Sequence, residues 1–479
     1  MPELSPRRRL LILAICCLSL LIVGMDATIV NVALSAIHHD LHASLPDLQW
    51  TIDAYTVVIA SLLMLAGSTA DRVGRKRTFL TGLVVFTLGS LLCSLAPSLG
   101  YLVGFRAVQA IGGSMLNPVA LSIITNIFTE PRERARAIGL WGGVVGLSLG
   151  LGPVVGGALI DSVGWRAVFW VNIPVGAVAF VLAALFVPES RAPRARRPDP
   201  VGQLFVILIL AGTTFGIIES PRVGWSSAQT IASLAVALIA LVALLYYEPR
   251  RADPLLDLRF FSSAPFSGAA VIAVCAFGAF AGFLFLITLY LQQVRQLSAL
   301  AAGACLLPLA AAAMIGAPTS GRVVGARGPR LPLAFAGAML TAGGLLLART
   351  TAHESYGVLI ACMLVFGLGF AAVNAPITNT AVSGMPREQA GVAAAVASTS
   401  RQVGTALGVA VVGTVLASGG ATSLGTGFVD AARVGWYVVA GCGFAVLVLG
   451  LLTTGPRARA SAARTARRVA EPAPLARVG

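Results

Sequence analysis

The residues of this chain that could do chemistry are polar side chains placed inside long apolar runs. Asp26 stands in the sequence LIVGMDATIVNVAL, within the apolar run 10–36, and Arg106 and Gln109 stand three residues apart in the run 99–127. A charge at the centre of a membrane helix costs about 2.5–3.5 kcal/mol, so a segment that retains one usually has a use for it. A carboxylate at that depth can bind and release a proton, and a buried arginine is its natural partner.

The composition places these runs in a membrane. Of the 479 residues, 57% are hydrophobic and 11% are charged, with a mean hydropathy of +0.87, whereas a soluble domain has about a quarter charged residues. The pattern predicts an all-α membrane protein, and the run after Arg7, Arg8 and Arg9 is interpreted as a first span, not as a cleavable signal peptide. Fourteen stretches have spanning length: 10–36, 50–70, 78–97, 99–127, 136–160, 166–187, 202–219, 228–247, 265–290, 299–320, 331–349, 356–381, 390–417 and 434–454.

The net charge of +15 is explained by how the basic residues are distributed along the chain. If the N-terminus is cytoplasmic, 27 of the 34 basic residues fall in inward-facing segments, as the positive-inside rule requires. We therefore expect both termini in the cytoplasm and no nucleic-acid partner. The seven cysteines fall in apolar stretches without a CxxC pair, so they are interpreted as small apolar side chains.

Two weak echoes indicate an internal repeat. The loop DRVGRKR after the second span resembles GRVVGARGPR after the tenth, and GSMLNP in the fourth span resembles AAVNAP in the twelfth. An offset of eight spans predicts two parallel six-helix bundles with two helices inserted between them, which is a transporter architecture. The predicted parts are a cytoplasmic N-terminus (1–9), a first bundle (10–187), cytoplasmic linkers (188–264) with inserted spans at 202–219 and 228–247, a second bundle (265–454) and a basic, disordered cytoplasmic tail (455–479).

Four patterns together resemble the major facilitator superfamily, and within it the fourteen-span drug:proton antiporter group of the EmrB/QacA type. GMDATIVNVAL is similar to the group's first-span motif, GSTADRVGRKR to the superfamily's loop signature, RAVQAIGG to its fourth-span motif and GLSLGLGPVVGG to the fifth-span motif of antiporters. The resemblance implies the major facilitator fold. It also implies export of amphipathic small molecules such as drugs, antibiotics or metabolites across the cytoplasmic membrane of a bacterium. The proton gradient would be the only energy source, with no cofactor, and the chain would act as a monomer.

Four residues are candidates for proton coupling: Asp26, Arg106, Asp53 and Glu219. The resemblance implies that Arg106 assists coupling, and the alternative is a purely structural buried pair with Asp26. Asp53, at the outer end of the second span, is a proton-entry group or a residue that favours a helix N-terminus. Glu219 lies near Arg222 and is either a coupling group or half of a surface pair.

Two further sets complete the candidate sites. Charge pairs in the loop after the second span could form in one conformation and break in the other, although the positive-inside rule alone explains its basic residues; this gating set is Gly67, Asp71, Arg72, Gly74, Arg75 and Lys76. Glycines in the fifth span permit close packing around a helix-bending proline, and the resemblance implies a hinge or seal there. The set for the substrate cavity or antiporter motif is Asn31, Gln109, Gly146, Gly150, Gly152, Pro153, Gly156, Gly157, Arg401 and Gln402.

Other functions are less consistent with the sequence. The string from Gly146 to Gly150 matches GxSxG, but all four histidines fall in predicted outward loops, so an intramembrane serine hydrolase would lack its base. His38, His39 and His42 are expected in a solvated loop and not at a metal. A proton-linked nutrient importer is the closest alternative to an exporter. We expect no enzymatic activity.

Overall fold

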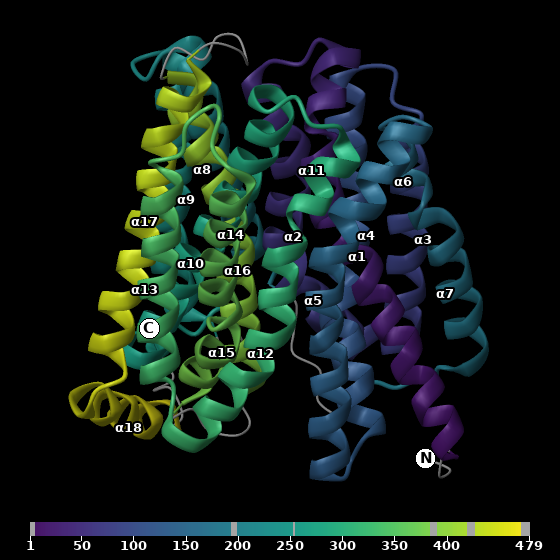
Figure 1. The fold of residues 1–479 in the computed structure, drawn as a ribbon. Coiled ribbons are helices and arrows are strands. Elements are labelled where there is room, and N and C mark those ends of the chain that lie inside the picture. The colour runs from purple at the N-terminus through teal and green to yellow at the C-terminus, as the bar shows by residue number, and fades with distance from the viewer. Residues whose placement is uncertain (1–4, 193–198, 252–253, 384–389, 419–426, 471–479) are drawn as a thin grey trace. The chain divides into compact units, whose positions relative to one another are not determined.

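The computed structural model describes residues 5–192, 199–251, 254–383, 390–418 and 427–470, which form helices joined by turns and short loops (Figure 1). Fourteen helical segments are long and apolar enough to cross a membrane, which confirms the predicted span count. The predictions for residues 1–4, part of the linker at 193–198, Arg387 and the end of the tail at 471–479 lie outside the described residues.

The chain divides into two compact units, and the first contains Met1–Pro198 and Ile287–Ala310. Within it, α1 packs against α4, α5 and α7, and α3 packs against α4 and α7. The helices of this unit are α1 (Pro6–Leu41), α2 (Leu45–Val73), α3 (Arg75–Ser94), α4 (Leu99–Ile127), α5 (Pro131–Ser162), α6 (Ala167–Trp170), α7 (Asn172–Phe186), the π-helix η3 (Tyr290–Val294) and α11 (Ala299–Cys305).

The second unit contains Asp199–Leu286 and Ala311–Gly479. The inserted pair α8 and α9 pack against each other, and α13 packs against α14 and α17. The helices are α8 (Pro200–Val223), α9 (Ala228–Tyr247), η1 (Glu248–Arg250), η2 (Leu258–Ser262), α10 (Ala264–Leu289), α12 (Leu307–Arg327), α13 (Arg330–Leu347), α14 (Tyr356–Ala371), α15 (Asn374–Val382), α16 (Ala390–Ser418), α17 (Phe428–Thr453) and α18 (Pro456–Ala470). These units group residues by contact, so the bundle boundaries inferred from the repeat remain predictions.

Three predicted spans are each formed by two helices: α6 and α7, α11 and α12, and α14 and α15. A proline follows each break, at Pro174, Pro308 and Pro376. Proline has no N–H to bond the carbonyl four residues earlier, and its ring clashes with that carbonyl. In each case that carbonyl lies at or beside the end of the preceding helix, so the prolines account for the interruptions.

The prediction of a disordered tail is wrong for Pro456–Ala470, which form the helix α18. Ala458, Ala462 and Thr465 are buried, and their spacing of four and three residues places them on one helix face. The Oγ atom of Ser461 accepts a 3.0 Å hydrogen bond from the backbone N–H of Ala264. The arginine content suggested disorder, but the alanine face packs against the protein and organises the segment.

Candidate functional site

The centre of the first unit holds an ion pair between Asp26 of α1 and Arg106 of α4. Nη1 of Arg106 lies 2.6 Å from Oδ2 of Asp26. The side chain of Asp26 is 0% exposed and that of Arg106 is 1% exposed. An ion pair so fully withdrawn from solvent is costly unless further hydrogen bonds satisfy both partners.

Two neutral amide side chains bond to the carboxylate, and a serine hydroxyl supports both amides. Nε2 of Gln109 donates to Oδ1 of Asp26 at 2.9 Å, and Nδ2 of Asn172 donates to the same oxygen at 3.0 Å. Both amides also reach Oγ of Ser90, at 3.3 and 3.0 Å. The Ser90 hydroxyl in turn donates to the backbone carbonyl of Phe169 at 2.9 Å. The network therefore joins α1, α3, α4 and α7 around one carboxylate.

The arginine has its own set of partners. Nη1 of Arg106 donates to Oε1 of Gln109 at 2.8 Å, and Nε donates to the carbonyl of Thr51 at 3.2 Å. Its Cζ atom lies 4.1 Å from the centroid of the Tyr55 ring. Both Thr51 and Tyr55 belong to α2, so the guanidinium ties that helix to the network and stacks on an aromatic face.

Sequence reasoning found Asp26, Arg106 and Gln109 but missed Ser90 and Asn172. Asn172 lies in the stretch WRAVFWVNIPVG, at the first position of α7 after the break that follows Trp170. A buried asparagine in an apolar span is a visible signal, whereas Ser90 is an ordinary residue in a helix and gives none. The arrangement can hold one negative charge in an apolar interior, because the carboxylate has a counter-ion and two amide donors.

Asp53 lies on α2 and is completely buried, but it is not part of this network. Its Oδ1 atom accepts a 3.0 Å hydrogen bond from Oγ1 of Thr56, and its Oδ2 atom has no hydrogen-bond partner among the described residues. Glu219 belongs to the second unit and lies 3.9 Å from Nη1 of Arg222. The structure therefore places these two candidates outside the set of residues that surrounds Asp26.

The gating loop is the junction of α2 and α3. Gly74 joins the two helices with φ +127°, in the left-handed region that favours glycine, and a Cβ there would lie 2.6 Å from Oε1 of Glu189. Nη2 of Arg75 donates to Oδ1 of Asp71 at 3.0 Å. Nζ of Lys76 donates to the carbonyl of Ala184 at 2.7 Å.

The acid that faces this junction is Glu189, three residues after the end of α7, which the sequence interpretation did not select. Its Oε1 atom accepts from the backbone N–H of Lys76 at 3.2 Å, and its Oε2 atom lies 3.8 Å from Nε of Arg77. Arg72 is exposed, and a Cβ on Gly67 would have nothing within 4 Å. The junction is therefore fastened to the end of α7 by Glu189, in addition to the predicted pairing of Asp71.

The glycine-rich part of α5 packs closely against α1 and α11. A Cβ on Gly152 would lie 2.0 Å from Oγ1 of Thr28, and one on Gly156 would lie 2.4 Å from Cγ1 of Ile29. On the α11 side, a Cβ on Gly157 would lie 2.4 Å from the carbonyl oxygen of Ala299. These contacts confirm close packing and hold the segment of α1 that carries Asp26 between α5 and α4.

The remaining members of that set are placed as follows. A Cβ on Gly150 would lie 3.0 Å from Cβ of Ala310, and the carbonyl oxygen of Pro153 lies 2.2 Å from the position of a Cβ on Gly303. Nδ2 of Asn31 donates to the carbonyl of Ala27 within its own helix, at 3.1 Å. Gly146, Arg401 and Gln402 are partly buried, the last two on α16 in the second unit.

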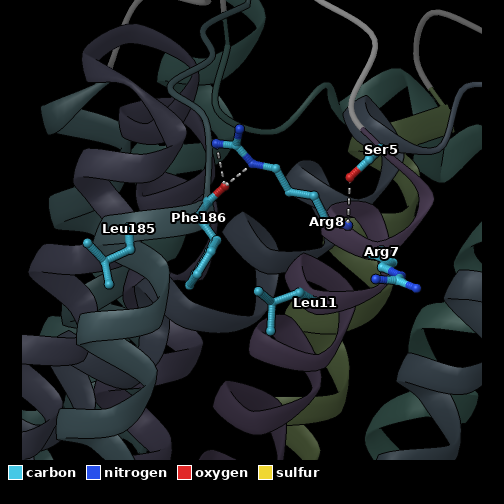
Figure 2. Close-up of a pocket in the computed structure, with 6 residues that line it drawn as sticks. All are labelled: Ser5, Arg7, Arg8, Leu11, Leu185 and Phe186. Carbon is cyan, nitrogen blue, oxygen red and sulfur yellow. Dashed lines mark hydrogen bonds between the residues drawn. The ribbon is translucent and has the colours of Figure 1, made fainter.

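A shallow hollow lies at the N-terminal end of α1, far along the helix from Asp26 (Figure 2). Nε and Nη2 of Arg8 donate to the carbonyl of Phe186 at 3.2 and 3.1 Å, as Figure 2 shows. Phe186 ends α7, and a cation there complements the helix dipole. The hollow therefore marks a helix-capping contact between α1 and α7.

Comparison with known proteins identifies the family. The Major Facilitator Superfamily model matches residues 16–409. The chain belongs to this superfamily. As a member of a transporter family with fourteen candidate spans, it is a multi-pass membrane protein and not an enzyme. The Ser148 hydroxyl of the GxSxG string is consistent with this, because it donates to the carbonyl of Val144 at 2.9 Å.

Major facilitator proteins of bacteria are similar over most of the chain. It is 37% identical over 412 residues to the multidrug resistance protein Stp of Mycobacterium tuberculosis, covering 86% of this chain and 76% of that protein. It is 38% identical over 403 residues to the tetracenomycin C resistance and export protein of Streptomyces glaucescens, covering 83% and 74%. It is 33% identical over 412 residues to the multidrug efflux pump LfrA of Mycolicibacterium smegmatis, covering 86% and 81%.

Solved structures support the fold of this superfamily. A bacterial homolog of the human lysosomal transporter Spinster matches with a TM-score of 0.62 at 18% identity, covering 97% of this chain and 98% of that one. The major facilitator fold predicted from the sequence is therefore confirmed.

Proposed function

We propose that the chain is a proton-coupled exporter of amphipathic small molecules, such as drugs, antibiotics or metabolites, that works by alternating access. The observation that carries the proposal is the ion pair between Asp26 and Arg106 at the centre of an apolar helical unit. The relatives named for multidrug resistance, efflux and export support the direction and the substrate type.

Protonation of Asp26 is the proposed coupling event. With Asp26 ionised, the carboxylate neutralises Arg106 and accepts from Gln109 and Asn172. A proton on the carboxyl removes the negative charge, so the buried guanidinium loses its counter-ion and the balance of hydrogen bonds changes. A change that favours one conformation over the other shifts the population between inward-open and outward-open states. Each inward proton releases about 2.3 kcal/mol per 100 mV of membrane potential.

Asp53 is proposed as a second proton carrier on the entry path. It is fully buried, and among the described residues its carboxyl has one hydrogen bond, from Thr56. An ionised carboxylate with so few partners is costly in an apolar interior, whereas a protonated one is not. Glu219 is buried but lies near an exposed partner, Arg222, and we assign it a weaker role.

The junction of α2 and α3 is proposed as the gate. The pair of Glu189 with Arg77 is part-exposed, whereas Arg75 in its pair with Asp71 is only 15% exposed; both pairs lie beside helix ends. Such pairs form a two-state element when their partners move apart in the other conformation. We also propose that both termini are cytoplasmic, that two six-helix bundles flank the inserted pair, and that the protein acts as a monomer.

Substrates can be found by expressing the protein in a bacterial strain that lacks its own exporters and testing a panel of dyes, antibiotics and metabolites. For a transported dye, inverted vesicles then test coupling. We expect wild-type protein to move the dye into these vesicles only when a pH gradient, acidic inside, is present. Counterflow in oriented vesicles distinguishes export from proton-linked import by direction.

Asp26→Asn is the decisive variant. It should abolish transport driven by the pH gradient but retain dye exchange, because the amide imitates the uncharged carboxyl and can no longer release a proton. Asp40→Asn is the matched control, since Asp40 lies on the same helix as Asp26 and forms a part-exposed ion pair with Arg166. Full gradient-driven transport by Asp26→Asn would remove Asp26 from the mechanism.

A further inference from the structure

The second unit contains a membrane-depth cation without an acidic partner. Arg401 lies on α16, within the candidate span Val392–Ser418. In the described part of the chain, its guanidinium has no carboxylate within ion-pair distance. An arginine inside a membrane span almost always faces the protein interior or a cavity and is paired. The residues around Arg401 therefore indicate which kind of anionic ligand could pair with it.

Two hydroxyl groups are the hydrogen-bond partners of the guanidinium. Nη1 of Arg401 donates to Oγ of Ser398 at 3.1 Å, and Nη2 donates to Oγ1 of Thr378 on α15. The Nε atom is buried and has no hydrogen-bond partner among the described residues. Guanidinium groups bind carboxylates with two parallel N–H bonds, so neutral hydroxyls leave much of this capacity unused.

An aromatic ring lies beside the cation. The Cζ atom of Arg401 is 5.9 Å from the centroid of the Phe277 ring on α10. Phe277 is partly exposed and packs edge-on against Phe370 at 5.2 Å, and Phe370 stacks on Phe280 at 4.0 Å. Because Phe280 and Phe370 are buried, they hold the Phe277 ring in place while part of its surface stays open.

Close backbone contact fixes the position of Arg401 relative to this ring. A Cβ on Gly404 would lie 2.4 Å from the carbonyl oxygen of Val274, and one on Gly408 would lie 2.3 Å from that of Gly278. Gly404 is three residues after Arg401, so both lie on the same face of α16. The α10 contact therefore directs Arg401 towards the side of α10 that carries Phe277.

The acidic residues of the described C-terminal spans lie elsewhere in the sequence. Glu354 is in the loop before α14, and Asp430, in the first turn of α17, is 80% exposed and pairs with Arg433 at 3.3 Å. Neither of these two acids, in the described part of the chain, pairs with Arg401. A cationic ligand would be repelled there, and an anionic one would supply the partner that the guanidinium lacks.

We propose that Arg401, Phe277 and Thr378 form a substrate subsite that binds the acidic group and adjoining ring of an aromatic anion. The guanidinium binds a carboxylate, sulfonate or acidic phenol, and Phe277 packs against the ring. The Thr378 hydroxyl, which donates to the carbonyl of Asn374 at 3.2 Å and accepts from Nη2 of Arg401, holds the guanidinium in position. The preferred substrates are thus aromatic amphipaths with a negative charge. This inference rests on the proposed export function and names its substrate class.

Two dyes with the same xanthene ring system test the inference: fluorescein, which is anionic at neutral pH, and rhodamine 123, which is cationic. Both are loaded into exporter-deficient cells that express the protein, and efflux is followed by fluorescence. We expect wild-type protein to export fluorescein with a kcat/KM at least about tenfold above that for rhodamine 123, since charge-assisted hydrogen bonds discriminate by about this factor.

Variants assign the preference to the subsite. Arg401→Gln should lower fluorescein export about tenfold and leave rhodamine 123 export unchanged or raised, and Arg401→Glu should favour rhodamine 123. Thr378→Val keeps the charge and should lower fluorescein export about fivefold. Arg433→Gln, which removes an exposed positive charge from the same unit, should have no effect. Size-exclusion chromatography of each purified variant verifies folding.

The dye experiments distinguish failure of the subsite from failure of the proposed export function. The subsite is refuted if wild-type protein exports neither dye or prefers rhodamine 123, or if folded Arg401→Gln loses both dyes equally. Gradient-driven export of rhodamine 123 that depends on Asp26, without export of fluorescein, would keep the proposed function and overturn the subsite. Fluorescein export that depends on Arg401 but not on Asp26 or the pH gradient would keep the subsite and overturn the proposed proton coupling.

Discussion

Asp26 and Arg106 are 80 positions apart in the sequence, yet their side chains meet at 2.6 Å in the interior of one helical unit. The two amides that bond to Asp26, those of Gln109 and Asn172, also bond to Ser90 on α3. The pair is therefore the point at which a single proton can alter the contacts among several helices at once.

Replacing only one partner of this ion pair should lower the free energy of unfolding more than replacing both partners. Arg106→Gln leaves a buried carboxylate without its counter-ion and should destabilise the protein by about 3–5 kcal/mol. The double variant Asp26→Asn with Arg106→Gln should recover most of that loss, because neither charge remains. Chemical unfolding of the purified proteins measures the cycle, and additive effects of the two single changes would show that the pair is not coupled.

The amide of Asn172 should matter for transport although it carries no charge. Asn172→Leu removes the donor that joins Asp26 to Ser90. Hydrogen bonds to charged groups contribute about 1.5–3 kcal/mol, so gradient-driven efflux should fall at least about tenfold. The comparison is Ser114→Ala, which removes a buried hydroxyl whose bond in the described structure stays within its own helix, to the carbonyl of Ile111. Equal losses in both variants would argue against a specific role for Asn172.

Glycines on α5 should differ in their tolerance to a single methyl group. Gly157→Ala places a Cβ against the backbone of Ala299 and Leu300, which cannot move cheaply, so it should destabilise the protein. Gly142→Ala, on the same helix, meets nothing within 4 Å and should stabilise it by up to about 1 kcal/mol. Thermal unfolding monitored by tryptophan fluorescence would compare the two, and similar shifts would contradict the packing.

Glu189 should affect the rate of transport more than stability. Glu189→Gln weakens its contacts with Lys76 and Arg77, which are partly exposed and thus worth at most about 1 kcal/mol. If the junction is a gate, the maximal efflux rate should fall several-fold with little change in apparent substrate affinity. Glu133→Gln, which breaks the part-exposed pair with Arg9, provides the control. An unchanged rate would leave Glu189 as a structural contact only.

The sequence by itself determined the membrane class, the fourteen spans and the presence of Asp26 and Arg106 among them. These are local properties, because the cost of placing a charge in an apolar run depends on its immediate neighbours and is visible in one stretch of chain. Gln109 could be placed beside Arg106 for the same reason, since residues three apart share a helix face.

The tertiary structure decided which helices supply the remaining partners. Ser90 and Glu189 have no special pattern in their own segments, and Asn172 is visible only as a polar residue in an apolar span. The partners of all three arise only where helices from distant parts of the chain meet. Likewise, Gly152 and Gly157 lie in one motif but contact α1 and α11, respectively. Hydropathy and helical period specify where each helix lies in the sequence. Which side chains of different helices contact one another depends on the packing of several helices together, which no single stretch of sequence encodes.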